Sequence, residues 1–272
     1  MSTALWRDTR NRHQESIAKS ATANAGLIVR RGLREWPNSS DSGTVAGTAK
    51  ADLIQRIAGM AVPDGYRWAY DRWATATTGG AFASVNLDLI GRLYIGLTRD
   101  SALETGITVQ HAWGMPMIPG SALKGISRRA AQTTSTLKDR ADVIEWMFGS
   151  EDDTRPECGG VVFHDAWWDP ASNKKPFAAE IVTPHHAEYY NMGARHATDF
   201  DSPIPAPQIA AQGRFRFVVQ VESERGNKEN DRPWTKLVLA LLKIALQQHG
   251  VGGKTTSGYG LFESAGNAGA AQ

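Results

Sequence analysis

The sequence predicts an α+β fold whose main elements follow the order β-α-β-β-α-β. Two observations carry this prediction. Alternation of apolar and polar residues, typical of half-buried strands, recurs in separate segments, and segments with the apolar spacing of helices lie between them. With 272 residues, the chain is long enough to bury a substantial core.

Four strands are predicted, at Ser84–Leu97, Gly159–Trp168, Gly213–Ser223 and Ser257–Ser264. The third shows the clearest alternation. Its apolar face holds Phe215, Phe217, Val219 and Val221, and its other face holds Arg214 and Arg216. Because successive side chains of a strand point to opposite faces, we expect the apolar face of this strand to lie in the core.

Two helices are predicted between these strands. The first follows a Gly/Pro-rich segment, and Ser121 is placed to cap it, since a serine hydroxyl can accept a first-turn N–H. The second runs from Pro233 to Gln248 and carries its apolar residues on one stripe. Asp231 is its expected N-cap, and Gly250 is the expected glycine just after its end.

The element order is the split βαβ, or ferredoxin-like, arrangement that RNA-recognition domains share. We expect a helical N-terminal elaboration over residues 1–83, packed on a domain at 84–264. An insertion at about 169–212 separates the middle strands, and residues 265–272 are expected to form a disordered tail. Turn-forming residues predict a flexible loop at 37–48.

Composition excludes several classes of protein. The formal net charge is only +2, so any nucleic-acid-binding surface must be local. Cys158 is the single cysteine, which rules out an intrachain disulfide and a cysteine-based zinc site. The N-terminal residues lack the apolar core of a signal peptide, and no apolar run approaches a membrane span. We expect a soluble, cytoplasmic protein without a cofactor.

The segment HGVGGKTTSGYGLF suggests a phosphate-binding loop at first sight. A P-loop needs an earlier glycine where Gln248 stands, a strand before it and a helix after it, and the predicted flanks are reversed. The loop can still bind phosphate, because glycines let amides approach an anion and a lysine adds charge. The candidate RNA-binding residues are Gly252, Gly253, Lys254, Thr255, Thr256, Ser257 and Tyr259, the last for base stacking. The competing interpretation is a packing turn with a solvated lysine.

A second candidate RNA-binding group lies at the start of the first predicted helix. It comprises Ser121, Lys124, Arg128 and, with weaker support, Arg129. Helix N-termini favour phosphate, and residues four apart share a helix face. An ordinary capped helix with surface bases explains the same pattern equally well.

The histidines do not predict a metal site. His185 and His186 are adjacent, so in an extended segment they point to opposite sides. No His-x-x-x-His pair is present. His185, Tyr189 and Tyr190 are better interpreted as a weak candidate contact to a neighbouring subunit or to RNA.

Several stretches resemble one family. GMPMIPGSALKGISRR (residues 114–129) and GVGGKTTSGYGLF (250–262) resemble motifs of the RAMP superfamily of CRISPR-associated proteins. FHDAWWDP, IVTPHHAEYYN, DFDSPIPAPQI and NAGLIVRRGL resemble the sixth-subunit family of type III-B (Cmr) effector complexes. The resemblance spans residues 24–262.

The resemblance implies a role rather than a reaction. It implies a non-catalytic structural subunit of an RNA-guided, RNA-targeting complex in antiviral defence, which caps the backbone filament near the 3′ end of the guide RNA. The implied partners are guide (CRISPR) RNA, a backbone RAMP subunit, a small helical subunit and a neighbouring capping RAMP subunit. Target RNA joins when the complex binds it, and no membrane is involved.

Two other functions stay open. Metal-independent endoribonucleases that process precursor guide RNA share this fold and its glycine-rich loop. His111 or His249 could then transfer protons while Lys254 stabilises the developing phosphate charge, although neither histidine has an evident acid–base partner. A scaffold that contacts only proteins is the third possibility.

Overall fold

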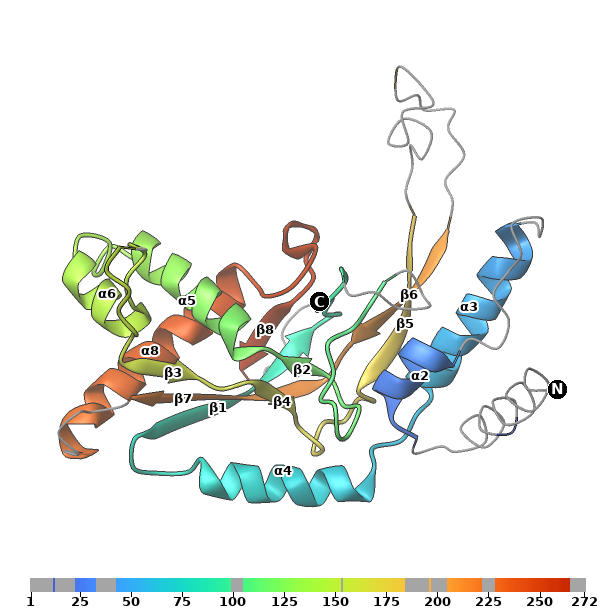
Figure 1. Ribbon diagram of the computed structural model, residues 1–272, viewed down its shortest axis with the longest axis horizontal. Helices are drawn as coiled ribbons and strands as arrows, with labels where there is room; N and C mark the ends of the chain where they lie inside the picture. Colours follow the sequence, from blue (N-terminus) through green and yellow to red (C-terminus); the bar gives the residue numbers. More distant parts are fainter. Residues whose placement is uncertain are drawn as a thin grey trace.

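The structure of the chain is a computed structural model. It describes residues 12, 23–32, 43–98, 105–152, 154–183, 196, 205–221 and 228–264, but not the side chains of 43–47 and 228–232. The helices are α2 (Ala25–Arg31), α3 (Gly43–Ala58), α4 (Asp64–Ala76), α5 (Gly120–Thr133), α6 (Ala141–Phe148) and α8 (Lys228–Gln248) (Figure 1). The strands are β1 (Phe82–Ile90), β2 (Met117–Ile118), β3 (Val161–Phe163), β4 (Ala166–Trp168), β5 (Phe177–Val182), β6 (Ala206–Ala211), β7 (Arg214–Val221) and β8 (Leu261–Ser264).

The larger sheet follows the order β2-β4-β7-β1-β8, with β3 also paired to β7. Its strand pairs are antiparallel. β1 lies between β7 and β8, so that Asp88 pairs with Arg214 and Ile90 pairs with Leu261. An antiparallel sheet combined with helices confirms the α+β prediction.

Three predicted strands have clearly different limits in the structure. The strand predicted at Ser257–Ser264 begins only at Leu261, because Ser257 ends a short 3₁₀ turn. β1 ends at Ile90 and not at Leu97, because Gly91 takes a left-handed φ of 74° and turns the chain. The strand predicted at Gly159–Trp168 is divided into β3 and β4, and only His164 and Asp165 lie between them.

One face of the sheet is covered by α5 and α8 (Figure 1). The predicted apolar face of β7 lies on this side and is buried, as are Phe262 of β8 and Val238, Leu241 and Ala245 of α8. Phe262 meets Phe215 and Phe217 edge-on, with ring centroids 6.0 and 5.1 Å apart. The prediction that this face of β7 lies in the core is confirmed.

The opposite face is covered by α4, which lies within the predicted helical elaboration at 1–83 but is not predicted as a separate helix (Figure 1). Trp73 stacks on Trp167 of β4, with centroids 4.8 Å apart and an interplanar angle of 9°. The Tyr66 hydroxyl donates to the carbonyl oxygen of Trp168. Tyr66, Tyr70 and Trp73 are spaced i, i+4, i+7, which is the helical signal that the sequence carried.

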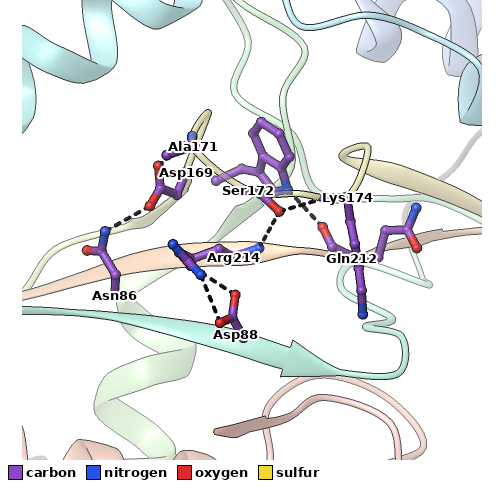
Figure 2. Close-up of polar contacts among 9 residues, drawn as sticks. Asn86, Asp88, Asp169, Ala171, Ser172, Lys174, Gln212 and Arg214 are labelled. Carbon is purple, nitrogen blue, oxygen red and sulfur yellow. Dashed lines mark hydrogen bonds and ion pairs between the residues drawn. The ribbon is translucent and has the colours of Figure 1, made fainter. Parts of the chain in front are cut away.

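A polar network fixes the turn between β4 and β5 over the sheet (Figure 2). Asp169, only 3% exposed, accepts hydrogen bonds from Asn86 Nδ2 and from the Ala171 N–H, each at 2.8 Å. Beside it, Arg214 donates twice to the Asp88 carboxylate, at 2.9 and 3.0 Å. Each carboxylate oxygen of Asp169 therefore has a donor, which makes this buried acid a structural group.

β5 and β6 form a separate two-stranded antiparallel sheet within the predicted insertion, and α3 contacts both strands (Figure 1). α3 begins at Gly43, so the prediction of a loop at 37–48 is wrong for residues 43–48. Glycine and threonine favour a loop locally, but the buried side of α3, with Leu53, Ile54 and Ile57, favours the helix through tertiary packing. The predicted tail at 265–272 lies outside the described residues.

The ends of α8 test two cap predictions. The helix begins at Lys228, so Asp231 lies inside it and is not its N-cap. Pro233 lies inside the helix, five residues after Lys228, where it has no N–H to donate to the Glu229 carbonyl. At the other end, Gly250 has a φ of 70° and its N–H donates to the Ala245 carbonyl at 3.0 Å, which confirms the predicted C-terminal glycine.

Candidate nucleic-acid interface

The glycine-rich loop at 249–260 joins α8 to β8. A helix precedes the loop and a strand follows it, so the structural context of a P-loop is absent here. Gly252 has a φ of 90°, and a Cβ there would overlap the Tyr94 carbonyl oxygen. A Cβ on Gly260 would likewise overlap the Val251 carbonyl. The close approach of these backbone segments requires glycine at both positions.

Backbone hydrogen bonds fix the loop on the end of the sheet. Gly253 donates to the Tyr94 carbonyl at 2.7 Å, and Gly260 donates to the Arg92 carbonyl at 2.9 Å. Val251 donates to the Gly260 carbonyl at 3.0 Å and closes the base of the loop. The outer part of the loop is therefore held on a rigid base.

The exposed tip of the loop presents donors. Lys254 is exposed and has a φ of 58°, the one positive φ at a non-glycine position among the described residues. A short 3₁₀ turn follows at Thr255–Ser257. The amides of Lys254, Thr255 and Thr256 donate to no described group. Left-handed and right-handed residues in succession turn consecutive amides to one side, a geometry suited to an anion.

Tyr259 is half-buried, and its ring lies 4.7 Å from that of Tyr94 at an interplanar angle of 33°. One side of the ring is thus already in contact within the protein, which leaves less of it for the predicted base stacking. Burial raises the pKa of Tyr94 above its ordinary value. The contact between Tyr94 and Tyr259 joins the loop to the segment that supports it.

The start of α5 differs from the prediction. Pro119 is the N-cap residue and makes no side-chain cap bond, so Ser121 does not cap the helix. The Asp165 carboxylate does this instead, because its Oδ1 accepts from the Gly120 N–H at 2.7 Å. A carboxylate at this position satisfies the helix dipole and reduces the attraction of the first turn for a phosphate.

The basic residues of α5 are in different states. Arg128 forms an ion pair with Glu151 at 2.8 Å, so its charge is partly neutralised. Ser121 and Arg129 are exposed and Lys124 is half-buried. Within the described part of the chain, neither Lys124 nor Arg129 has an ion-pair partner. These two residues keep the charge that the predicted interface needs.

A ladder of backbone bonds connects the glycine-rich loop to α5. The first bond runs from the Gly253 N–H of the loop to the Tyr94 carbonyl. The next residue, Ile95, accepts from the Thr108 N–H at 2.8 Å, and the Thr108 carbonyl accepts from the Met117 N–H at 3.2 Å. Met117 belongs to β2, which leads directly into α5. These bonds therefore connect the segments that hold the two predicted groups.

The histidines show no catalytic arrangement in the described part of the chain. His111 and His249 are exposed, and no described acid forms an ion pair or hydrogen bond with either ring. His164 Nε2 lies 3.1 Å from Gln220 Oε1. No group of three or more potential metal ligands occurs among the described residues. His185, Tyr189 and Tyr190 lie outside them.

One polar cluster went unpredicted. Arg92 Nη1 donates to Gln212 Oε1 at 2.7 Å, and Arg92 Nε lies 3.7 Å from a Glu180 carboxylate oxygen. Gln212 Nε2 in turn donates to the Phe177 carbonyl at 3.1 Å. The cluster joins the base of the β5–β6 hairpin to the segment that supports the glycine-rich loop. Its members come from three distant parts of the sequence, and no local pattern indicates them.

Comparison with known proteins identifies the family. The RAMP superfamily model matches residues 86–263, well over half of the chain, and the chain belongs to this superfamily. It is similar to the CRISPR system Cmr subunit Cmr6 of Pyrococcus furiosus, with 27% identity over 62% of this chain and 64% of that protein. It is also similar to the Cmr6 subunit of Saccharolobus solfataricus, with 29% identity over 59% of this chain and 49% of that protein. The predicted resemblance to the sixth Cmr subunit is thereby confirmed.

The chain spans less than two thirds of the length of each of these relatives. Among solved structures, a chain of the type III-B Cmr-β complex bound to cognate target RNA has a TM-score of 0.59 and 20% identity, covering 96% of this chain and 88% of that one. At that identity the likeness concerns the fold. Among the described residues, no helix has the length and apolar character to cross a bilayer.

Proposed function

We propose that this chain is a non-catalytic, RNA-binding structural subunit of a type III-B CRISPR effector complex, acting in cytoplasmic antiviral defence. Membership of the RAMP superfamily and the similarity to Cmr6 subunits support the complex. The observation that carries RNA binding is the loop tip, where Lys254 and three amides that donate to no described group lie on a hydrogen-bonded base. Contacts to phosphates position an RNA strand without recognising its base sequence.

The proposal includes the predicted partners and location in the complex. The chain would cap the filament of backbone RAMP subunits near the 3′ end of the guide RNA, beside the small helical subunit and a second capping RAMP subunit. Target RNA would approach when the complex binds it. We also propose the ferredoxin-like domain at 84–264, which the strand order β4-β7-β1-β8 supports, and the helical elaboration at 1–83.

A purification of the assembled complex tests this function. The complex would be isolated with the wild-type chain, with Lys254→Ala and with Lys236→Ala, and the guide RNA per complex would be measured. Lys236 is an exposed lysine of α8 outside the loop and serves as the matched control. We expect reduced guide retention with Lys254→Ala alone. Full retention with Lys254→Ala would remove the loop from the RNA interface.

The competing function is processing of precursor guide RNA by a metal-independent endoribonuclease. His111 and His249 are exposed, and neither has a described acid to orient it, which supports a non-catalytic role. Incubation of the chain with repeat RNA in EDTA separates the two functions. Specific cleavage that is lost on His249→Ala or His111→Ala would establish the enzyme and contradict the structural role.

A further inference from the structure

A pocket of about 820 Å³ opens between α2, the turn at 109–116 and β4. Its lining includes Arg30, Gln110, His111, Trp113, Asp165 and Trp167. It lies beside the backbone ladder described above, because Val109 and Gln110 directly follow Thr108. The pocket is therefore close to a segment that supports the predicted RNA-binding groups, although none of its residues belongs to those groups.

Gln110 has an unusual environment in this pocket. Its backbone is fixed, since its N–H donates to the Met115 carbonyl at 2.9 Å and its carbonyl accepts from the Gly114 N–H at 2.8 Å. The residue is only 7% exposed, yet neither side-chain amide atom has a hydrogen-bond partner among the described residues. Buried polar groups are nearly always paired. Both atoms are also covered, so a ligand that pairs with this amide must offer a donor and an acceptor and must displace the groups that cover it.

Two indole rings give the pocket rigid aromatic walls. Trp167 is held on one side by its stack with Trp73. Trp113 is held against Gly65 at the start of α4, where a Cβ would contact its ring. Both indoles also line the pocket. Rings fixed in this way need little ordering when a planar ligand binds.

Charged groups complete the site. Arg30 and His111 are exposed, so they can face a phosphate outside the pocket. Asp165 uses Oδ1 to cap α5, and its Oδ2 accepts from no described group. That oxygen can accept from the exocyclic amine of a ligand.

We infer that this pocket binds one nucleobase of single-stranded RNA, with the base between the indoles and the Gln110 amide, and the phosphate toward Arg30 and His111. This inference rests on the proposed RNA-binding function. Single-stranded RNA is recognised by stacking on aromatic side chains and by hydrogen bonds to base edges, and glutamine can pair with a base through both amide atoms. Leu27, 47% exposed at the same pocket, would suit an apolar side chain of a protein instead, and the experiment distinguishes that occupant.

The test measures binding of the full chain to two fluorescent RNAs, one normal and one with the same phosphoribose backbone but no bases. The variants are Gln110→Leu and the control Gln132→Leu, which changes an exposed glutamine on α5. Gln110→Leu keeps the size of the side chain and removes two unpaired polar atoms, so we expect it to fold normally. We expect Gln110→Leu to weaken binding of the normal RNA about tenfold, and Gln132→Leu to leave it unchanged. On the abasic RNA, both variants should equal the wild type.

Two results would overturn the base pocket while RNA binding stands: equal affinity of Gln110→Leu and wild type for normal RNA, or an equal loss on both RNAs. A wild-type chain that binds neither RNA would instead count against the proposed function itself. A second measurement does not depend on any variant. Photocrosslinking of RNA that contains 5-iodouridine to the wild-type chain should label Trp113 or Trp167, and labelling only elsewhere would contradict the pocket.

Discussion

The backbone N–H of Gly253 donates to the carbonyl oxygen of Tyr94 across 2.7 Å. This bond joins two structures that are far apart in the sequence. On one side is the glycine-rich loop; on the other, Leu93 exchanges backbone bonds of 2.9 Å with Ala211 at the base of the β5–β6 hairpin. The short segment from Arg92 to Tyr94 thus supports the loop and the hairpin together.

The close contact between Gly252 and the Tyr94 carbonyl predicts that adding a methyl group at Gly252 lowers the stability of the protein. Gly252→Ala should destabilise the protein by about 2–4 kcal/mol, because the new Cβ overlaps the Tyr94 carbonyl and φ is 90°. Gly258→Ala is the matched control: φ is 85°, but no atom lies within 4 Å of its Cβ, so only about 1–2 kcal/mol is expected. Urea unfolding measures both. Equal losses would show that Tyr94 does not crowd Gly252.

The polar cluster at the base of the β5–β6 hairpin predicts that losing Gln212 destabilises the hairpin more than the rest of the sheet. Gln212→Ala should leave the Phe177 carbonyl without its side-chain donor and Arg92 Nη1 without the Gln212 acceptor, costing about 1–3 kcal/mol. Amide hydrogen exchange should then accelerate in β6 before it does in β7, because the hairpin is the less covered element. Uniform acceleration across both strands would contradict a local role for Gln212.

The Asp165 cap on α5 predicts that two substitutions of this residue reduce stability to different extents. Asp165→Ala should destabilise the protein by about 1 kcal/mol, because the Gly120 N–H loses its acceptor. Asp165→Asn should cost less, since the amide oxygen can accept the same bond. Thermal unfolding compares the two. An Asp165→Ala protein as stable as the wild type would mean that the cap contributes nothing measurable.

The buried tyrosines of α4 predict a loss of stability in alkali. Burial raises the pKa of Tyr66 and of Tyr70 above the ordinary value, with the charge of Asp169 adding to it for Tyr70. The folded-state pKa lies above the unfolded one, so the stabilisation is complete below about pH 10 and is lost as the pH rises beyond it. The slope reaches at most about 1.4 kcal/mol per pH unit for each tyrosine. Urea unfolding between about pH 8 and 11 should show this decline, less steeply in Tyr70→Phe; a flat profile would refute it.

Some parts of this fold follow from local sequence and others do not. The alternation of β7 identifies its buried face because a half-buried strand repeats every two residues. The stripe of α8 and Gly250 at its end are equally local signals. By contrast, Asp165 caps a helix that begins 45 residues earlier, and α3 extends through Gly43–Thr48 while its apolar side packs against a distant hairpin. Contacts of that kind depend on the tertiary arrangement, which periodicity does not encode.

The candidate interface divides in the same way. Glycine, lysine and threonine in succession indicate the loop, and the structure places them on an exposed turn. The partner of Arg128, the ring beneath Tyr259 and the unpaired amide of Gln110 are set by residues elsewhere in the chain. Residue types therefore indicate which residues could bind RNA, and tertiary contacts determine which of those side chains still have a hydrogen-bond donor available.

The salt dependence of RNA binding tests most directly whether the loop contacts phosphate. The full chain, Lys254→Ala and the charge-preserving Lys254→Arg would be titrated with single-stranded RNA at several salt concentrations. If Lys254 neutralises one phosphate, Lys254→Ala should bind more weakly, and its slope of log K against log salt should be shallower by about 0.7. Lys254→Arg should keep the wild-type slope. Identical affinity and slope for Lys254→Ala and wild type would contradict the claim that this loop holds RNA.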